Sequence, residues 1–245
     1  MSNVICIKWG SKFTSLYVNK LYSMVKRNLK RDFRFVCMTD NPEGINEEIE
    51  VKDIPLTGIE DFDKRHPWVL AHGWLKLAAF ASPLHDLKGP TLFLDLDVVI
   101  VDNIDCFFEQ EGEFIAIKEW DKRKKDVTGN TSVFRFNPGA HADALEYLKN
   151  NISSVYARAR NEQEFITGYV ASQGKLTYWP QKWCRSFKRH CLPKPLGWFA
   201  PSRIPEGAKV IVFHGKPDPH DTIKGISGKW YRRVAPADWV EENWR

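Results

Sequence analysis

The sequence predicts an α/β protein with a mostly parallel central sheet. Two observations predict this class. Short apolar runs are typical of buried strands, and they alternate along the chain with longer segments whose apolar residues recur at helical spacing. Such alternation is typical of a parallel sheet covered by helices. The 245 residues are 43% hydrophobic, which suffices for one sizeable core, so we expect a single domain over residues 1–245.

The first part of the chain predicts three strands with a helix after the first. The apolar run from Val4 to Lys8 predicts the first strand, and apolar residues three and four apart predict an amphipathic helix from Phe13 to Leu29. The run FRFVCMT, Phe33 to Thr39, predicts the second strand because it ends at the turn signal Asp40-Asn41-Pro42. A short third strand is expected near Ile49 to Val51.

The remaining elements follow from the same patterns. An irregular segment (53–67) precedes a helix from Val69 to Ala81, which Pro83 stops. Further apolar and periodic segments predict strands from Thr91, at Phe114 to Glu119, Ser132 to Asn137 and Lys209 to His214, and helices at Ala140 to Asn150 and Glu162 to Ser172. Residues 173–205 are rich in Trp, Pro and basic residues without a clear period, so we expect a loop-rich cap there.

Composition narrows the function classes. The net charge of +5 is modest; it suits a phosphorylated ligand or a position near an anionic membrane surface, and does not indicate nucleic acid. No apolar stretch approaches membrane-spanning length, and we expect no signal peptide at the N-terminus. Five dispersed cysteines without a C-x-x-C pair are typical of a reduced, cytoplasmic protein, which is compatible with a location at the inner face of the membrane.

The most informative segment is TLFLDLDVVIVDNID, residues 91–105. Its apolar residues predict one buried strand, and because side chains alternate along a strand, Asp95 and Asp97 should point the same way while Leu96 points into the core. Two adjacent buried carboxylates are costly without compensation, and a hard divalent cation, Mg²⁺ or Mn²⁺, would remove that cost. We interpret the pair as a metal site that holds phosphate groups; the alternative is a pair that caps a strand end in solvent.

Polar residues at other strand ends support a site at one edge of the sheet. Ligands of parallel sheets bind at the carboxyl ends of the strands. Asp40, Asp97 and His214 all lie at or just after a predicted strand end. We therefore expect these residues to lie near one binding site.

The aspartate pair resembles the first motif of the haloacid-dehalogenase phosphatases. That resemblance would make Asp95 a nucleophile and Asp97 a general acid/base. The chain lacks the Ser or Thr that this family places after a second strand, here FIAIKE, and its aspartates come after roughly a third of the chain instead of in the first strand. We keep this phosphatase as the alternative function.

The order of motifs more closely resembles the nucleotide-sugar-dependent glycosyltransferases of the GT-A fold, in particular family 8 and its distant bacterial relatives. The segments that carry the resemblance are WLKLAAF (74–80), FLDLDVVIVDNIDCFF (93–108), NTSVFRFNPG (130–139), NEQEF (161–165) and VIVFHGKPDPH (210–220). It implies a Rossmann-like three-layer sandwich. Two segments depart from the family pattern: the first strand ends in Lys8-Trp9-Gly10 instead of a small residue followed by Asp, and His214 to Pro217 are contiguous where the family spacing is longer.

The resemblance implies roles for the metal ligands. Asp95 would contact the ribose and the metal, Asp97 would ligate the metal, and His214 would complete the set as neutral imidazole. His220 is an alternative ligand. Mixed carboxylate and imidazole ligation favours Mn²⁺ over Mg²⁺.

The resemblance also implies a nucleotide-sugar site. Its candidate residues are Trp9 and Tyr17 on the base, Lys76 on the donor, Asp95 on the ribose, Asn130 in the sugar pocket and Lys216 on the diphosphate. For Tyr17 the alternative is packing on a helix face, and for Asn130 it is a role in a turn.

Catalytic candidates lie at the start of the helix predicted over 162–172. Glu162, Gln163 and Glu164 would position acceptor and sugar, with Glu164 as a candidate base; the alternative is a polar helix N-terminus favoured by the helix dipole. In the cap, aromatic residues are candidates for a sugar-stacking platform or for a small core: Trp179, Trp183 and Trp198. Basic residues there are candidates for binding an anionic acceptor: Arg185, Lys188 and Arg189.

The sequence thus predicts a metal-dependent glycosyltransferase of the hexosyltransferase type. Its donor would be a nucleotide-diphosphate sugar, with UDP favoured, and its acceptor a glycan or lipid-linked molecule, as in bacterial surface polysaccharide or lipopolysaccharide synthesis. Besides the phosphatase, an inactive carbohydrate-binding module is a further alternative. An inactive site would not need the costly buried charges predicted here, which argues against that module.

Overall fold

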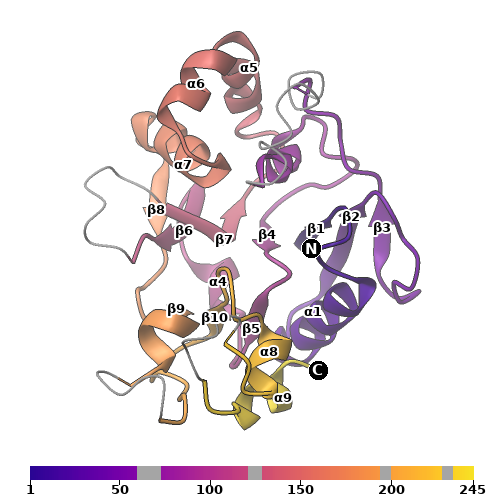
Figure 1. Ribbon diagram of the computed structural model, residues 1–245. Coiled ribbons are helices and arrows are strands. Elements are labelled where there is room, and N and C mark those ends of the chain that lie inside the picture. Colours follow the sequence, from indigo (N-terminus) through magenta and orange to yellow (C-terminus); the bar gives the residue numbers. More distant parts are fainter. Residues whose placement is uncertain (60–72, 121–128, 194–199, 228–233) are drawn as a thin grey trace.

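A seven-stranded mixed sheet forms the centre of the fold in the computed structural model (Figure 1). The structure describes residues 1–59, 73–120, 129–193, 200–227 and 234–245. Within these ranges the strands are β1 (Ser2–Lys8), β2 (Phe33–Thr39), β3 (Glu50–Lys52), β4 (Thr91–Leu94), β5 (Val98–Ile100), β6 (Phe114–Lys118), β7 (Gly129–Phe136), β8 (Leu176–Tyr178), β9 (Cys184–Ser186) and β10 (Val210–Val212).

The strand order confirms the predicted mostly parallel sheet. The central sheet runs β3-β2-β1-β4-β7-β6-β8, and a smaller sheet runs β5-β10-β9. In the central sheet β7 is antiparallel to both of its neighbours, and the other pairs are parallel. The carboxyl ends of β1, β4 and β6 therefore meet the amino end of β7 at one edge.

Helices cover both faces of this sheet. Within the described ranges they are α1 (Ser15–Asn28), the 3₁₀ helix η1 (Trp74–Phe80), α4 (Cys106–Glu109), α5 (Ala142–Asn150), α6 (Ile152–Arg158), α7 (Glu162–Ser172), the π-helical turn η2 (Phe187–Cys191), α8 (Pro219–Ile223) and α9 (Asp238–Asn243). In Figure 1, α5, α6 and α7 gather on one side, whereas α1, α8 and α9 gather with the smaller sheet on the other. This arrangement confirms the predicted three-layer α/β architecture.

Strand periodicity divides the core into two halves, one on each face of the sheet. In β1, Cys6 packs with α1 and the smaller sheet, whereas Ile5 packs with η1 and α5. In β4, Leu92 and Leu94 join the first half and Phe93 the second. Burial of one such side chain contributes about 1.5–3 kcal/mol to the stability of the fold, so packing on both faces stabilises the central strands.

The aspartate segment departs from the predicted single strand. β4 ends at Leu94 and β5 begins at Val98 in the other sheet, so Asp95 and Asp97 lie in a connection between two sheets. Backbone hydrogen bonds hold this connection on both sides: the Asp95 N–H donates to the Ser132 carbonyl, and the Phe213 N–H donates to the Asp97 carbonyl. The expected single strand was therefore wrong, because the chain leaves the central sheet between Leu94 and Val98, although Leu96 is buried in the core as expected.

Two other predicted segments differ in detail. Of the helix predicted over 69–81, residues 74–80 form the 3₁₀ helix, and 69–72 lie outside the described residues. The irregular segment predicted over 53–67 is described only to residue 59. None of the helices in the described ranges combines the length and apolar character needed to cross a membrane.

The segment 173–205 contains regular structure as well as loops. It supplies β8 to the edge of the central sheet and β9 to the smaller sheet. Trp179 is 2% exposed and packs against Phe107, as does Trp183, with ring centroids 4.8 and 5.4 Å away. Trp179 and Trp183 thus pack into the main core on the face that α1 covers, not into a separate small one, and Trp198 lies outside the described residues.

Candidate functional site

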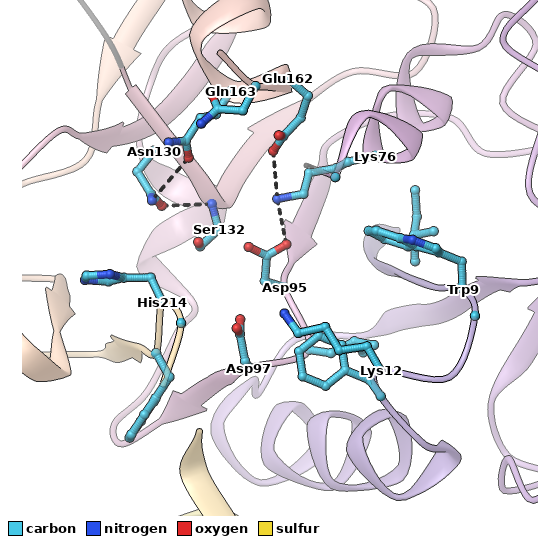
Figure 2. A pocket seen from close by; sticks show the side chains of 18 of the residues that line it. Trp9, Lys12, Lys76, Asp95, Asp97, Asn130, Ser132, Glu162, Gln163 and His214 are labelled. Carbon is cyan, nitrogen blue, oxygen red and sulfur yellow. Dashed lines mark hydrogen bonds and ion pairs between the residues drawn. The ribbon is translucent and has the colours of Figure 1, made fainter. Parts of the chain in front are cut away.

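A cavity of about 750 Å³ lies at the edge of the central sheet where β1, β4 and β6 end and β7 begins (Figure 2). Its walls bring together many of the residues predicted from the sequence: Trp9, Lys76, Asp95, Asp97, Asn130, Glu162, Gln163 and His214. Trp9, Asp95 and Asp97 follow strands of the central sheet, Asn130 lies at the start of β7, and His214 follows β10 of the smaller sheet. The other three lie in the first turns of η1 and α7: Lys76, Glu162 and Gln163. The cavity therefore lies where ligands of α/β sheets bind, beyond the carboxyl ends of strands.

Lys76 links the aspartate segment to helix α7. From η1, its ammonium group forms ion pairs with Asp95, at 2.7 Å, and with Glu162, at 3.3 Å (Figure 2). Burial lowers the pKa of Lys76, but the two carboxylates raise it, and the net result lies above its ordinary value. Burial also raises the pKa of Glu162. Lys76 thus stays charged and holds Asp95 in place.

Asp97 is a buried carboxylate without a direct partner. It is 9% exposed, and its carboxylate forms no hydrogen bond or ion pair with the residues that the structure describes. Burial, and then the charge of Asp95, raise the pKa of Asp97 to about 8; Lys12 and Lys76 oppose this effect. Because a buried unpaired carboxylate is costly, the site is one that a cation would stabilise.

His214 does not join the two aspartates in this structure. Its Nε2 lies 2.6 Å from the Ser186 hydroxyl, its ring stacks on Trp120, and Figure 2 shows the ring directed away from Asp97. Among the described residues, the three ligand atoms that lie within 4.8 Å of one another belong to Asp218, His220 and Asp221. The predicted ligand set of Asp95, Asp97 and His214 is therefore not assembled here.

The environment of His214 gives a testable pH effect. Burial, together with Lys188 and Arg189, lowers the pKa of His214 to about 4 from its ordinary 6.5. The unfolded chain then binds a proton that the folded chain rejects, so stability is lost as pH falls from about 6.5 towards 4. Between about pH 7 and about pH 5, the free energy of unfolding of wild type should fall by about 2 kcal/mol more than that of His214→Gln. Urea unfolding at the two pH values measures this difference. Parallel pH curves for the two proteins would contradict this expectation.

Helix α7 presents only part of its first turn to the cavity. Asn161 caps the helix, accepting a hydrogen bond from the Glu164 N–H at 3.0 Å. Gln163 accepts a hydrogen bond from the Asn130 amide at 3.3 Å, so this pair forms one polar wall (Figure 2). Glu164 instead pairs with Arg160 and is not in the cavity wall. Successive helical residues lie about 100° apart, so Glu162, Gln163 and Glu164 cannot share one face.

Other residues predicted for the site lie outside the cavity wall, among them Asp40, whose carboxylate accepts a hydrogen bond from the Gly10 N–H. The Tyr17 hydroxyl contacts His220 Nδ1, and its ring packs on Phe13 and Trp244, which matches the alternative of helix-face packing. Lys216 pairs with Asp218 and Asp221 at 2.7 and 3.0 Å. His220, the alternative metal ligand, is likewise engaged by Tyr17.

Several cavity residues had not been singled out from the sequence for a role in the site. They include Lys12 and Phe13 from the β1–α1 loop, Ser132 from β7, and Glu119 and Trp120 after β6. Arg189, expected near an anionic acceptor, also lines the cavity. Asp97 was predicted because polar residues just beyond the end of a strand often line a binding site. The same rule could have identified Lys12 and Glu119.

Comparison with known proteins supports the fold. No protein-family model matches the sequence, and no curated protein matches it. Among solved structures, galactosyltransferase LgtC in complex with donor and acceptor sugar analogs is 15% identical, with a TM-score of 0.59 over 89% of this chain and 88% of that one. An active-site Gln-to-Glu mutant of LgtC is 14% identical, with a TM-score of 0.61 over 98% and 94%.

Likeness at this level of identity establishes the fold. The two LgtC structures match 89% and 98% of this chain, so the shared fold extends over nearly all of it. The expected GT-A fold is therefore confirmed: the chain has the fold of these galactosyltransferases, at 14–15% sequence identity.

Proposed function

We propose that this protein is a divalent-metal-dependent glycosyltransferase that moves a hexose from a nucleotide-diphosphate sugar to a glycan or lipid-linked acceptor. The observation that carries the proposal is the pair Asp95 and Asp97 in a 750 Å³ cavity, one aspartate held by Lys76 and the other buried without a partner. The fold shared with the sugar-transferring LgtC supports it.

The metal would be held by Asp95 and Asp97. Carboxylate oxygens suit Mg²⁺ and Mn²⁺, and the buried charge of Asp97 fits such an ion. The preference for Mn²⁺ depended on an imidazole ligand, and the His214 ring is instead bonded to Ser186. When bound, the metal would supply positive charge for the diphosphate leaving group.

The protein's own residues would bind and orient the donor. Lys76, held between Asp95 and Glu162, fixes the orientation of the Asp95 carboxylate that would meet the ribose. Trp9, at the end of β1, offers a ring for the base, with UDP favoured as the nucleotide. Asn130 and Gln163 would orient the sugar through amide hydrogen bonds.

The proposed location of the protein follows from its cysteines and its net charge. Free, dispersed cysteines fit a reducing cytoplasm, and the net charge of +5 fits peripheral contact with the inner face of a membrane. A glycan or lipid-linked acceptor in bacterial surface polysaccharide or lipopolysaccharide synthesis would be found there.

Thermal unfolding with nucleotides tests the proposal. Wild type should be measured with UDP, GDP and their sugars, each with Mn²⁺, Mg²⁺ or EDTA. A bound ligand at about 100 times its Kd stabilises by about 2.7 kcal/mol, which shifts Tm by roughly 5–10 °C for a chain of this size. Metal-dependent stabilisation by one nucleotide supports a donor site, and no stabilisation by any nucleotide contradicts it.

The phosphatase alternative makes a different prediction. Its nucleophile would be Asp95, whose carboxylate is already bound by Lys76 at 2.7 Å. A phosphatase would hydrolyse phosphate esters, would lose that activity in Asp95→Asn, and would bind no nucleotide. A protein without either property would be the inactive carbohydrate-binding module.

A further inference from the structure

The cavity needs a positive charge besides the metal if it binds a diphosphate. Cations in the described part of its wall are Lys12, Lys76 and Arg189. Lys76 is committed to Asp95 and Glu162, and withdrawing it would leave both carboxylates buried and unpaired. It therefore cannot turn to a ligand at low cost.

Lys216, the lysine expected to bind the diphosphate, is also committed. It donates to Asp218 and Asp221, which are each 7% exposed. These carboxylates also cap α8: the Asp218 N–H donates to Asp221 at 2.9 Å. Lys216 is not in the cavity wall. Moving it towards the cavity would leave the negative charges of two buried carboxylates uncompensated.

Lys12 has the opposite properties. It lies in the cavity wall on the β1–α1 loop, and its ammonium group is directed towards Asp97 in Figure 2. Apart from a contact with the Phe13 ring at 4.5 Å, its ammonium group has no ion-pair partner within the ranges that the structure describes. It is exposed to the cavity and available for an anionic ligand next to the metal-binding aspartates.

The loop that carries Lys12 is held in place from β2. Gly10 has a φ of +58°, in the left-handed region that favours glycine, and its N–H donates to Asp40 at 2.8 Å. Lys8 donates to the Asn41 carbonyl at 2.9 Å. These contacts place Lys12 over the cavity before any ligand binds, which lowers the entropy lost on binding.

We propose that Lys12, in place of Lys216, binds the diphosphate of the nucleotide donor and neutralises the charge of the nucleoside diphosphate that leaves. This assignment rests on the proposed function. A lysine is a usual point charge for phosphate. In the proposed donor complex the base would lie on Trp9 and the ribose at Asp95, so Lys12 would contact the diphosphate alone. Lys12 thus acts as a binding residue for the leaving group.

Matched lysine variants test the assignment. Lys12→Met and Lys216→Met should be titrated by calorimetry, with Mn²⁺ present, against UDP and UMP and against GDP and GMP. For the diphosphate that binds wild type, Lys12→Met should weaken affinity about 10- to 100-fold, and Lys12→Arg should retain most of it. The monophosphate should lose much less, and Lys216→Met should change either affinity by about twofold or less.

The outcomes separate the two proposals. Wild type that binds neither diphosphate overturns the proposed function and this assignment together. If wild type binds one diphosphate, and Lys216→Met weakens that affinity as much as Lys12→Met or more, the assignment alone is overturned. An equal loss of diphosphate and monophosphate in Lys12→Met also overturns it. Unchanged ligand-free Tm in Lys12→Met confirms that the exposed substitution leaves the fold intact.

Discussion

Asp97→Asn is expected to abolish metal-dependent nucleotide binding while leaving the metal-free protein at least as stable as wild type. The buried Asp97 carboxylate has no direct partner among the described residues, so its only proposed role is to hold the cation. Asparagine keeps the shape and removes the charge. Thermal unfolding with Mn²⁺ and nucleotide should show no stabilisation of the variant, and transfer activity should fall by about 10³-fold or more.

The sign of the pH effect follows from the raised pKa. Burial and Asp95 raise the pKa of Asp97 to about 8 from an ordinary value of 3.8, so the folded chain keeps a proton that the unfolded chain releases. In EDTA, wild type should therefore lose stability as pH rises from about 4 to about 8, on the order of a few kcal/mol. Asp97→Asn should lack this loss.

Asp102→Asn is the matched control. Asp102 is half exposed and pairs with Lys209 outside the cavity. Its hydrogen bond from Lys209 lowers the pKa of Asp102, so this carboxylate stabilises the fold at neutral pH and loses that effect as pH falls. The variant should keep the response to Mn²⁺ and nucleotide. A metal response retained by Asp97→Asn, or lost equally by both variants, would refute the assignment.

Lys76→Met is expected to destabilise the protein by about 3–5 kcal/mol, because it leaves Asp95 and Glu162 without their shared partner. The free energy of unfolding should be measured by urea denaturation at neutral pH. A second substitution, Glu162→Gln, removes one of the two orphaned carboxylates and should recover part of the loss. The coupling between the sites measures the Lys76–Glu162 interaction directly.

Lys209→Met provides the surface comparison for that experiment. Its partner Asp102 is solvent-exposed, so loss of this ion pair should cost about 0–1 kcal/mol. A loss in Lys76→Met no greater than in Lys209→Met would mean that the buried ion pairs contribute little. A double variant less stable than Lys76→Met would show that Glu162 has another role in the fold.

Local patterns predicted the regular elements well where burial repeats along the chain. β2 spans Phe33–Thr39 and α7 spans Glu162–Ser172, both as expected, because their residues alternate or recur at the period of the element that buries them. The mostly parallel sheet and the cavity at its edge follow from the order of such elements. Short elements such as α4 and α6 were missed because one or two helical turns give little periodicity.

The orientations of side chains around the site depended on partners far away in the sequence. Asp95 and Asp97 leave the strand because Ser132 and Phe213 hold their backbone from two different sheets. His214 turns to Ser186, which lies 28 residues earlier in the chain. A local sequence pattern does not predict these orientations, because each depends on a hydrogen-bonding group that a distant segment of the chain brings close.

The sequence alone determined which residue types gather at one edge of the sheet, because strand order and periodicity decide where strands end. Only the tertiary structure decided which lysine is available there. Lys216 and Lys76 are held by buried carboxylates, whereas Lys12 faces the cavity without an ion-pair partner in the described residues. The physical reason is that a buried carboxylate is costly without a cation, so a lysine that pairs with one is not released to bind a ligand. Such pairs form between segments that only the fold brings together.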